Sequence, residues 1–356
     1  MGNQTLDEAY DRLHRTGPEF GGDEEGNNGL SNHGPMAVEV LVRRGHEVDV
    51  PRWVDEYLPR LEALPEEGDR ITGRTWRDAL GDGRRVGDWT AYFSSQMTEQ
   101  PWREVLATWW PRLLPGISAG ATHGVIRVGH AIRTLLSGNE GATAQTELAH
   151  GLAFWAARWR SVPGVTAPAG TLDAAAALDA VPHLPVQRGV IASRIPKLAD
   201  LAGWSASLTS LRPAADAVDV EERLTDLIDA ATMRYLTHGY GSPVLLVHTA
   251  TAPNAVLHAL PVLPRRMWAP SLSAVWAASA AIVAMYEPAV ALPRSDLPAA
   301  PTGADPAAES VERAAAHGDE HVIKFTDTAV EAYARTGDPD ALAAAVHASQ
   351  LLEPRG

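Results

Sequence analysis

The spacing of apolar residues restricts the fold of this chain more than any other feature. Within residues 51–64, Trp53, Tyr57, Leu61 and Leu64 recur at intervals of three and four, which places them on one face of an amphipathic helix. Comparable stripes occupy residues 101–114, 122–136, 144–160, 219–238, 268–286, 305–317, 319–335 and 339–352. Clear alternation of apolar and polar residues, which marks a half-buried strand, is missing. We therefore expect an all-α fold.

Proline and glycine mark the breaks between these helices. Three segments of low apolar content are predicted to be flexible loops, at about 21–30, 163–171 and 293–306. The run 244–247 is ambiguous, because Val-Leu-Leu-Val fits a short strand as well as the interior of a helix. The sequence shows no internal repeat, and 293–306 resembles a connector more than a domain boundary. Residues 1–356 are therefore expected to form a single large helical domain.

Charge and composition exclude several classes of protein. Asp and Glu (44) outnumber Lys and Arg (30), and a net charge of −14 argues against binding to nucleic acid or to an anionic membrane. The chain has no cysteine, which excludes disulfides and thiolate ligands. The most apolar stretch, 268–286, is rich in alanine and is expected to be a buried core helix. With no apolar signal segment in residues 1–30, we expect a soluble cytoplasmic protein.

Histidine is the residue type that points to chemistry. Five of the 13 histidines lie in apolar surroundings or where a helix should begin: His33, His123, His130, His248 and His321. Four others lie beside polar or loop residues and are expected to have no role in a site: His14, His46, His183 and His347. Any single buried histidine is more often a packed residue with satisfied hydrogen bonds than a ligand. Several on separate helices instead indicate a metal site in the bundle core, where imidazole without thiolate suits Fe, Zn, Cu or Ni.

Lysine use singles out one further position. The chain has only two lysines, Lys197 and Lys324, so nearly all of its positive charge is arginine. Lys324 follows His321 by three residues, on the same helical face. Lysine, unlike arginine, loses its proton readily when buried, and a neutral amine can take up carbon dioxide to become a metal-binding carbamate. The alternative is a surface salt bridge from Lys324 to Glu320 or Asp327.

Taken together, several of these segments resemble the questin oxidase family of fungal and bacterial oxygenases. The matching pieces are Asn32–Met36, His123–Arg127, His248–Thr251 and Asp319–Lys324, with a weaker match at Leu148–Trp155. They keep a shared order and are spread from about residue 16 to residue 335. The resemblance implies oxidation or ring cleavage of an anthraquinone-like aromatic polyketide with O2, and a branch of the family uses non-haem Fe(II).

Carried over by position, the resemblance implies a catalytic iron site with five protein ligands. These are four imidazoles and a carboxylated lysine: His33, His123, His248, His321 and Lys324. His130, Arg127 and Asn32 are expected around the ligands or in the substrate pocket. For Arg127, a carbonyl-polarising role and a salt bridge are both open. The acidic stretch 23–28, which lengthens the loop before His33, departs from the family and bears on the substrate.

The expected partners are therefore an aromatic small molecule and O2, with Fe(II) as cofactor. A variant of this hypothesis is NADPH-dependent Baeyer–Villiger-type oxidation. The sequence has no nicotinamide or flavin fingerprint, so the reductant would have to come from elsewhere. Two other classes stay open: a zinc-dependent hydrolase with the same ligands, and a non-catalytic helical protein that binds hydrophobic ligands.

Overall fold

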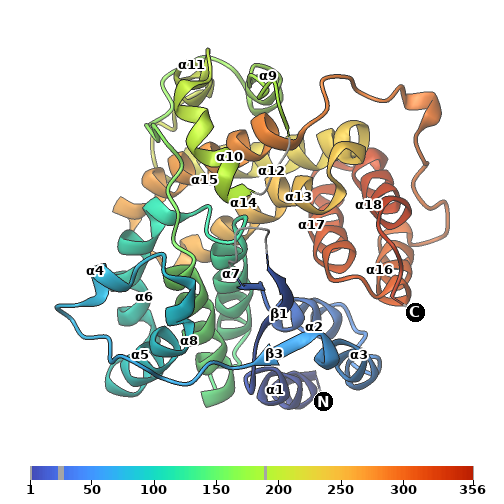
Figure 1. The fold of residues 1–356 in the computed structure, drawn as a ribbon. Coiled ribbons are helices and arrows are strands. Elements are labelled where there is room, and N and C mark those ends of the chain that lie inside the picture. Colours follow the sequence, from blue (N-terminus) through green and yellow to red (C-terminus); the bar gives the residue numbers. More distant parts are fainter. Residues whose placement is uncertain (1, 23–27, 188–190, 356) are drawn as a thin grey trace. The chain divides into compact units, whose positions relative to one another are not determined.

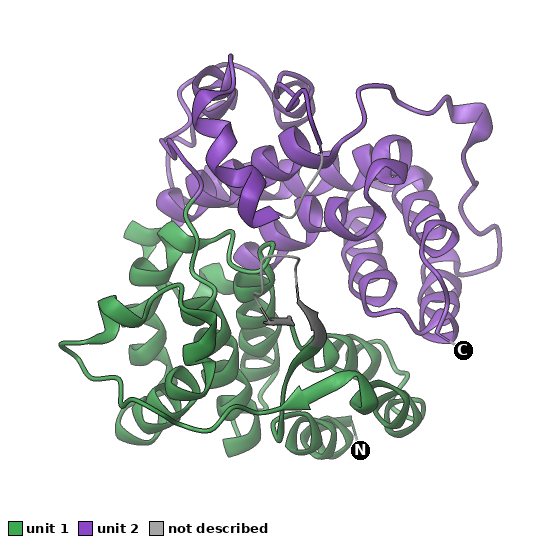
Figure 2. Cartoon of the chain, viewed as in Figure 1, with its two compact units in different colours: residues 1–161, 258–267 green, residues 162–257, 268–356 purple. Residues whose placement is uncertain are grey.

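The computed structural model describes residues 2–22, 28–187 and 191–355. Helices make up 69% of the structure and strands 3%, which confirms the all-α prediction. The residues group into two compact units, coloured separately in Figure 2: residues 1–161 with 258–267, and residues 162–257 with 268–356. The expectation of one domain over 1–356 stays a prediction.

The first unit contains eight of the labelled helices among its described residues (Figure 1). They are α1 (Gly2–Leu13), α2 (Gly34–Arg43), α3 (Val50–Tyr57), α4 (Trp76–Ala79), α5 (Val86–Glu99), α6 (Trp102–Leu113), α7 (His123–Leu136) and α8 (Ala142–Ala157). Helices α7 and α8 approach closely because each has glycine at the contact: a Cβ on Gly124 would lie 2.8 Å from Trp155, and one on Gly151 would lie 3.2 Å from Val128. Side chains of both helices, Arg127 of α7 and His150 and Phe154 of α8, line the same cavity.

The first unit also has a small antiparallel sheet of order β2-β1-β3, made of β1 (Thr16–Gly22), β2 (Asn28–Leu30) and β3 (Leu61–Ala63). The segment expected as a loop at 21–30 thus overlaps two strands, and its residues 23–27 lie outside the described residues. The helix expected over 51–64 ends at Tyr57, which corrects that prediction. Pro59 cannot donate a backbone hydrogen bond, and the chain passes through a 3-10 turn (Leu58–Arg60) into β3, whose backbone pairs with β1.

The remaining helices belong mainly to the second unit. They are α9 (Ala174–Asp179), α10 (Ile191–Arg194), α11 (Trp204–Ser210), α12 (Ala217–His238), α13 (Pro243–Leu246), α14 (His248–Ala259), α15 (Trp268–Tyr286), α16 (Pro306–His317), α17 (Glu320–Thr336) and α18 (Pro339–Leu351). Aspartate caps five of them, and each capping carboxylate accepts a hydrogen bond from a backbone N–H of the first turn: Asp173, Asp216, Asp305, Asp319 and Asp338. The ambiguous run 244–247 lies largely in α13, so it is helical.

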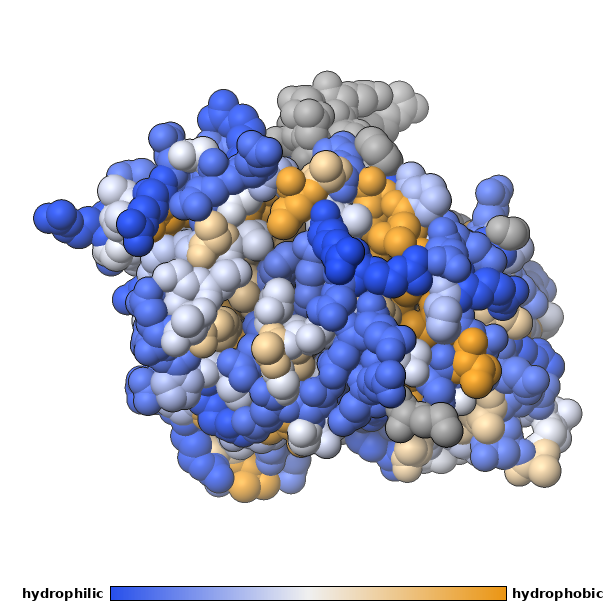
Figure 3. Space-filling view, turned by 90° about the horizontal axis from the view of Figure 1, so that it is seen from below, coloured by the Kyte–Doolittle hydropathy of each residue, from blue (hydrophilic) through white to orange (hydrophobic). Residues whose placement is uncertain are grey.

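Helix α15 is the apolar stretch expected in the core. A span over Arg265–Tyr286 is long and apolar enough to cross a membrane by length and composition, but 83% of its apolar window is buried inside the protein. The face in Figure 3 is mostly hydrophilic, with hydrophobic residues in small separate patches. Both observations are typical of a soluble protein with an apolar core helix.

Candidate metal and substrate site

The first unit brings together two of the predicted ligands, His33 and His123. His33 stands at the start of α2 and His123 begins α7, and their Nε2 atoms lie 2.7 Å apart. The backbone leading into α7 is strained, because Ala121 and Thr122 have positive φ angles of 56° and 71°. Such left-handed conformations cost non-glycine residues about 1–3 kcal/mol each and concentrate at functional sites. Here they aim the first side chain of α7 at His33.

The other ring nitrogen of each histidine is held by an acceptor. His33 Nδ1 lies 2.7 Å from Glu19 Oε1, and the hydroxyl of Tyr57 donates to the same oxygen at 2.5 Å. Burial alone would raise the pKa of Glu19, but its interactions with His33 and the hydrogen bond from Tyr57 lower that pKa to about 2. Glu19 is therefore ionised and accepts the proton of Nδ1. His123 Nδ1 faces the carbonyl oxygen of Gly120, which can only accept.

These bonds decide what the two Nε2 atoms can bind. With both Nδ1 atoms protonated, each neutral imidazole points an Nε2 lone pair at the other, and two lone pairs at 2.7 Å repel unless a positive species shares them. That species is a proton or a metal ion. A ligating histidine whose second nitrogen donates to a carboxylate or a carbonyl is the usual arrangement in metal sites. The donor set around His33 and His123 therefore fits a metal ion.

The second unit holds the other three predicted ligands. His248 begins α14, and its ring lies edge-on to that of His321 with centroids 5.7 Å apart. His248 Nδ1 lies 3.2 Å from the carbonyl oxygen of Leu245, so Nε2 again carries the lone pair. His321 is in the first turn of α17, and Asp319, the N-cap residue, accepts from the backbone N–H of His321 at 2.8 Å.

Lys324 lies one turn further along α17 and is 2% exposed. This burial contradicts the surface location that the salt-bridge alternative assumed, since Glu320 and Asp327 are buried as well. Glu320 forms an ion pair with Arg355. A lysine at such a depth loses much of the hydration that stabilises its charged form, which favours the neutral amine. The sequence argument for an unusual lysine at this position thus agrees with its burial.

The three residues expected around the ligands have different surroundings. Arg127 forms a two-point salt bridge with Glu147 at 2.6 and 2.8 Å, the second of the two roles considered for it. Asn32 accepts from the backbone N–H of Gly34 and so shapes the start of α2. His130 binds Glu39 through Nδ1 at 2.8 Å. Asn32 and Arg127 also line a cavity, whereas His130 is not among its lining residues.

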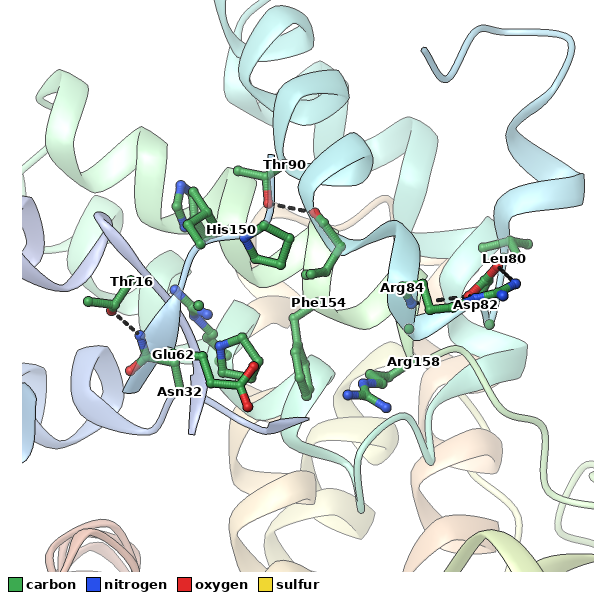
Figure 4. Close-up of a pocket in the computed structure, with 18 residues that line it drawn as sticks. Thr16, Asn32, Glu62, Leu80, Asp82, Arg84, Thr90, His150, Phe154 and Arg158 are labelled. Atoms are coloured by element: carbon green, nitrogen blue, oxygen red, sulfur yellow. Dashed lines mark hydrogen bonds and ion pairs between the residues drawn. The ribbon is translucent and has the colours of Figure 1, made fainter. Parts of the chain in front are cut away.

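That cavity has a volume of about 620 Å³ and lies within the first unit (Figure 4). Ligand pockets for small molecules range over about 300–1,000 Å³. Its wall is formed by the sheet, by the segment before α5 and by α8, including Glu62, Arg84, His150, Phe154 and Arg158. It borders the histidine pair through neighbours: Asn32 precedes His33, and Phe154 packs against Gly120, three residues before His123.

Several polar residues of this unit did not emerge from the sequence. No sequence motif contains Glu19 or Tyr57, because both come close to His33 only through the pairing of β1 with β3. His14, expected to have no role, is partly buried and lies with Nε2 2.9 Å from a carboxylate oxygen of Glu147. In the sequence, His150 stands out only as part of the weakly matching segment Leu148–Trp155, although its spacing to Phe154 and Arg158, four and eight residues on, is that of one helical face.

The comparison with protein families bears on this same part of the chain. Residues 52–160 match the model of the Questin oxidase-like family. The resemblance seen in the sequence is thus confirmed over this stretch, which contains His123, Arg127, His130 and the whole of α8. His33, His248, His321 and Lys324 lie outside it. No curated protein is similar enough to the chain to match it. The family is named for an oxidase, so the match indicates an oxidoreductase.

Proposed function

We propose that this protein is a non-haem Fe(II)-dependent oxygenase that oxidises or cleaves an aromatic, anthraquinone-like polyketide with O2. The observation that carries the proposal is the pair of Nε2 lone pairs of His33 and His123, each fixed by an acceptor at Nδ1. The family match supports the oxidase class and, by the family's name, a quinone-type substrate. A soluble cytoplasmic location is part of the same proposal.

The metal would be held by four imidazoles and a modified lysine, namely His33, His123, His248, His321 and a carboxylated Lys324. Bound Fe(II) would supply the electrons with which O2 is activated. Carboxylation would turn Lys324 from a cation into an anion. The negative charge of the carbamate would offset the positive charge of the metal inside the protein. A separate reductant such as NADPH would be needed only if one oxygen atom is transferred and the other is reduced to water.

The chain's own residues prepare the ligands. Glu19 accepts the Nδ1 proton of His33 and keeps the lone pair on Nε2, while Tyr57 links the carboxylate to the backbone N–H of His33 at 2.6 Å. The carbonyl oxygen of Gly120 accepts the Nδ1 proton of His123 and so keeps the lone pair of that imidazole on Nε2. Neither imidazole therefore needs to change tautomer to bind a metal, which makes both preorganised ligands.

The test is metal analysis of protein purified without an affinity tag. The proposal predicts stoichiometric iron in the wild-type protein. Most of this iron should be lost when any of the four histidines is replaced, in His33→Ala, His123→Ala, His248→Ala and His321→Ala. His46→Ala, at a partly exposed histidine that pairs with Asp49, is the matched control and should keep the wild-type iron content. Stoichiometric zinc with hydrolytic activity would replace the proposal by the hydrolase, and absence of metal would replace it by a binding protein.

The role of Lys324 has its own test. Lys324→Arg keeps charge and approximate length, but guanidinium cannot be carboxylated, so this variant should lose O2-dependent oxidation of hydroxyanthraquinones and much of its iron. Lys197→Arg, at the only other lysine, should be nearly unchanged. Full iron content and activity in Lys324→Arg would contradict the proposed ligand.

A further inference from the structure

The cavity of the first unit is lined by a row of three side chains, two from α8 and one from Arg158, the residue that caps its C-terminal end. His150, Phe154 and Arg158 follow one another at intervals of four residues, so they lie on one helical face, and all three border the cavity. Figure 4 shows them in this order, with Phe154 between the other two. At 1.5 Å per residue the row is about 12 Å long. It presents an imidazole, an aromatic ring and a guanidinium in sequence.

His150 is buried, and its ring nitrogens have no hydrogen-bond partner in the part of the chain that the structure describes. The residue is 8% exposed, and the ring of His14 covers it with centroids 4.7 Å apart. Glu147, one turn before it, is already occupied by two bonds from Arg127 and one with His14. Among the described residues no hydrogen bond reaches His150. A buried polar group of this kind, facing a cavity, is typical of ligand recognition.

Charge is distributed unevenly around the cavity. Glu62 lies in β3, next to Ala63, which pairs with Thr16 of β1. The carboxylate of Glu62 therefore stands on the side of the cavity that the sheet forms. Arg158 lies on the other side (Figure 4), close to Gly83: a Cβ there would be 2.9 Å from the guanidinium. Asp82, which also lines the cavity, has its charge balanced by a salt bridge with Arg84. An anionic ligand is therefore drawn toward Arg158 and kept away from Glu62.

We propose that this row binds an anionic, oxygen-substituted polycyclic aromatic molecule. Arg158 pairs with the anionic group, Phe154 packs against the ring system, and His150 forms a hydrogen bond with an oxygen at the opposite end. The inference rests on the proposed function and deepens it, because it assigns the residues that recognise the substrate and the charge that the substrate carries.

The electrostatics of His150 support this role. Burial lowers its pKa to about 3, and the charges of His14 and Arg127 contribute in the same direction. The imidazole therefore stays neutral at physiological pH and offers one donor and one acceptor. Hydroxyl and carbonyl oxygens of a quinone-type ring match such a group, whereas a second anion does not.

The test is calorimetric titration of the full-length protein without O2, using anthraquinone-2-carboxylate and its neutral carboxamide as probes. Wild-type protein is expected to bind the carboxylate more tightly. Arg158→Gln should weaken carboxylate binding at least tenfold and carboxamide binding less than threefold, because only the first loses a charge-assisted hydrogen bond. Arg52→Gln, at an exposed arginine of α3, should change neither.

The second arm concerns His150. His150→Phe keeps an aromatic ring and should weaken both probes about tenfold, whereas His150→Gln keeps a donor and an acceptor and should stay within about threefold of wild type. Equal losses for both probes in Arg158→Gln, wild-type binding by His150→Phe, or no binding by wild type would each overturn the inference. Iron content and O2 consumption test the proposed function separately. If the protein contains no iron but still binds the probes through His150 and Arg158, the proposed function fails and the inference stands.

Discussion

Replacing Arg127 by methionine should be among the most destabilising single changes in the first unit. The guanidinium of Arg127 donates to Glu147 at 2.6 and 2.8 Å, and both side chains are almost fully buried. Arg127→Met leaves the carboxylate with a single bond to His14. Removing one partner of a buried ion pair costs about 3–5 kcal/mol.

The pKa of Glu147 gives a second measure of the same interaction. Burial alone would raise it, but Arg127, and then His14, lower it from 4.5 to about 2. A difference of this size corresponds to roughly 3 kcal/mol. Because the folded-state pKa lies below the unfolded value, this stabilisation is complete above about pH 4.5 and is lost as the pH falls toward 2.

The assay is urea unfolding followed by tryptophan fluorescence, because eight of the 11 tryptophans lie in the first unit. With a urea dependence of about 3 kcal/mol per molar, the midpoint should fall by roughly 1–1.5 M. Arg127→Met combined with Glu147→Leu removes both charges and should be more stable than Arg127→Met alone.

The pH dependence separates a buried ion pair from simple loss of packing. In Arg127→Met, burial raises the pKa of Glu147, so protonation relieves the strain and the difference from wild type should shrink between pH 6 and pH 4.5. A loss below 1 kcal/mol, or a double variant whose loss equals the sum of the two single losses, would refute the reasoning.

Two further predictions concern α7 and α8. The first is His150→Gln, which removes a group that is neutral in the folded state and protonated in the unfolded state between pH 6.5 and about 3. Between pH 7 and 4.5 the unfolding free energy of this variant should therefore fall by about 2.5 kcal/mol less than that of wild type, and parallel curves would contradict this. Gly124→Ala should cost about 1–3 kcal/mol because its methyl group meets Trp155 at 2.8 Å, whereas Gly73→Ala, with nothing within 4 Å, is the control; equal thermal midpoints would argue against the close contact.

The helical class and most helix positions were predictable because helix periodicity is a local property. The predicted segments 268–286 and 305–317 match α15 and α16 to within one residue. The prediction over 51–64 was wrong beyond Tyr57, since the apolar spacing of Leu61 and Leu64 continues past the helix. That spacing did not reveal that the backbone of β3 would find a partner in β1.

The candidate site shows the same division. Histidine context and the rarity of lysine picked out His33, His123 and Lys324 from the sequence alone, and the burial of Lys324 agrees with that choice. The sequence did not reveal that Glu19 and Gly120 set the tautomers, or that His150 faces a cavity beside an occupied Glu147. His33 and His123 are 90 residues apart, and their 2.7 Å approach depends on packing between α2 and α7. The spacing of apolar residues shows which face of a helix is buried. It does not show which segment packs against that face, because this is decided only when distant segments come together. The tertiary structure therefore also decides which proton or charge each buried polar group meets.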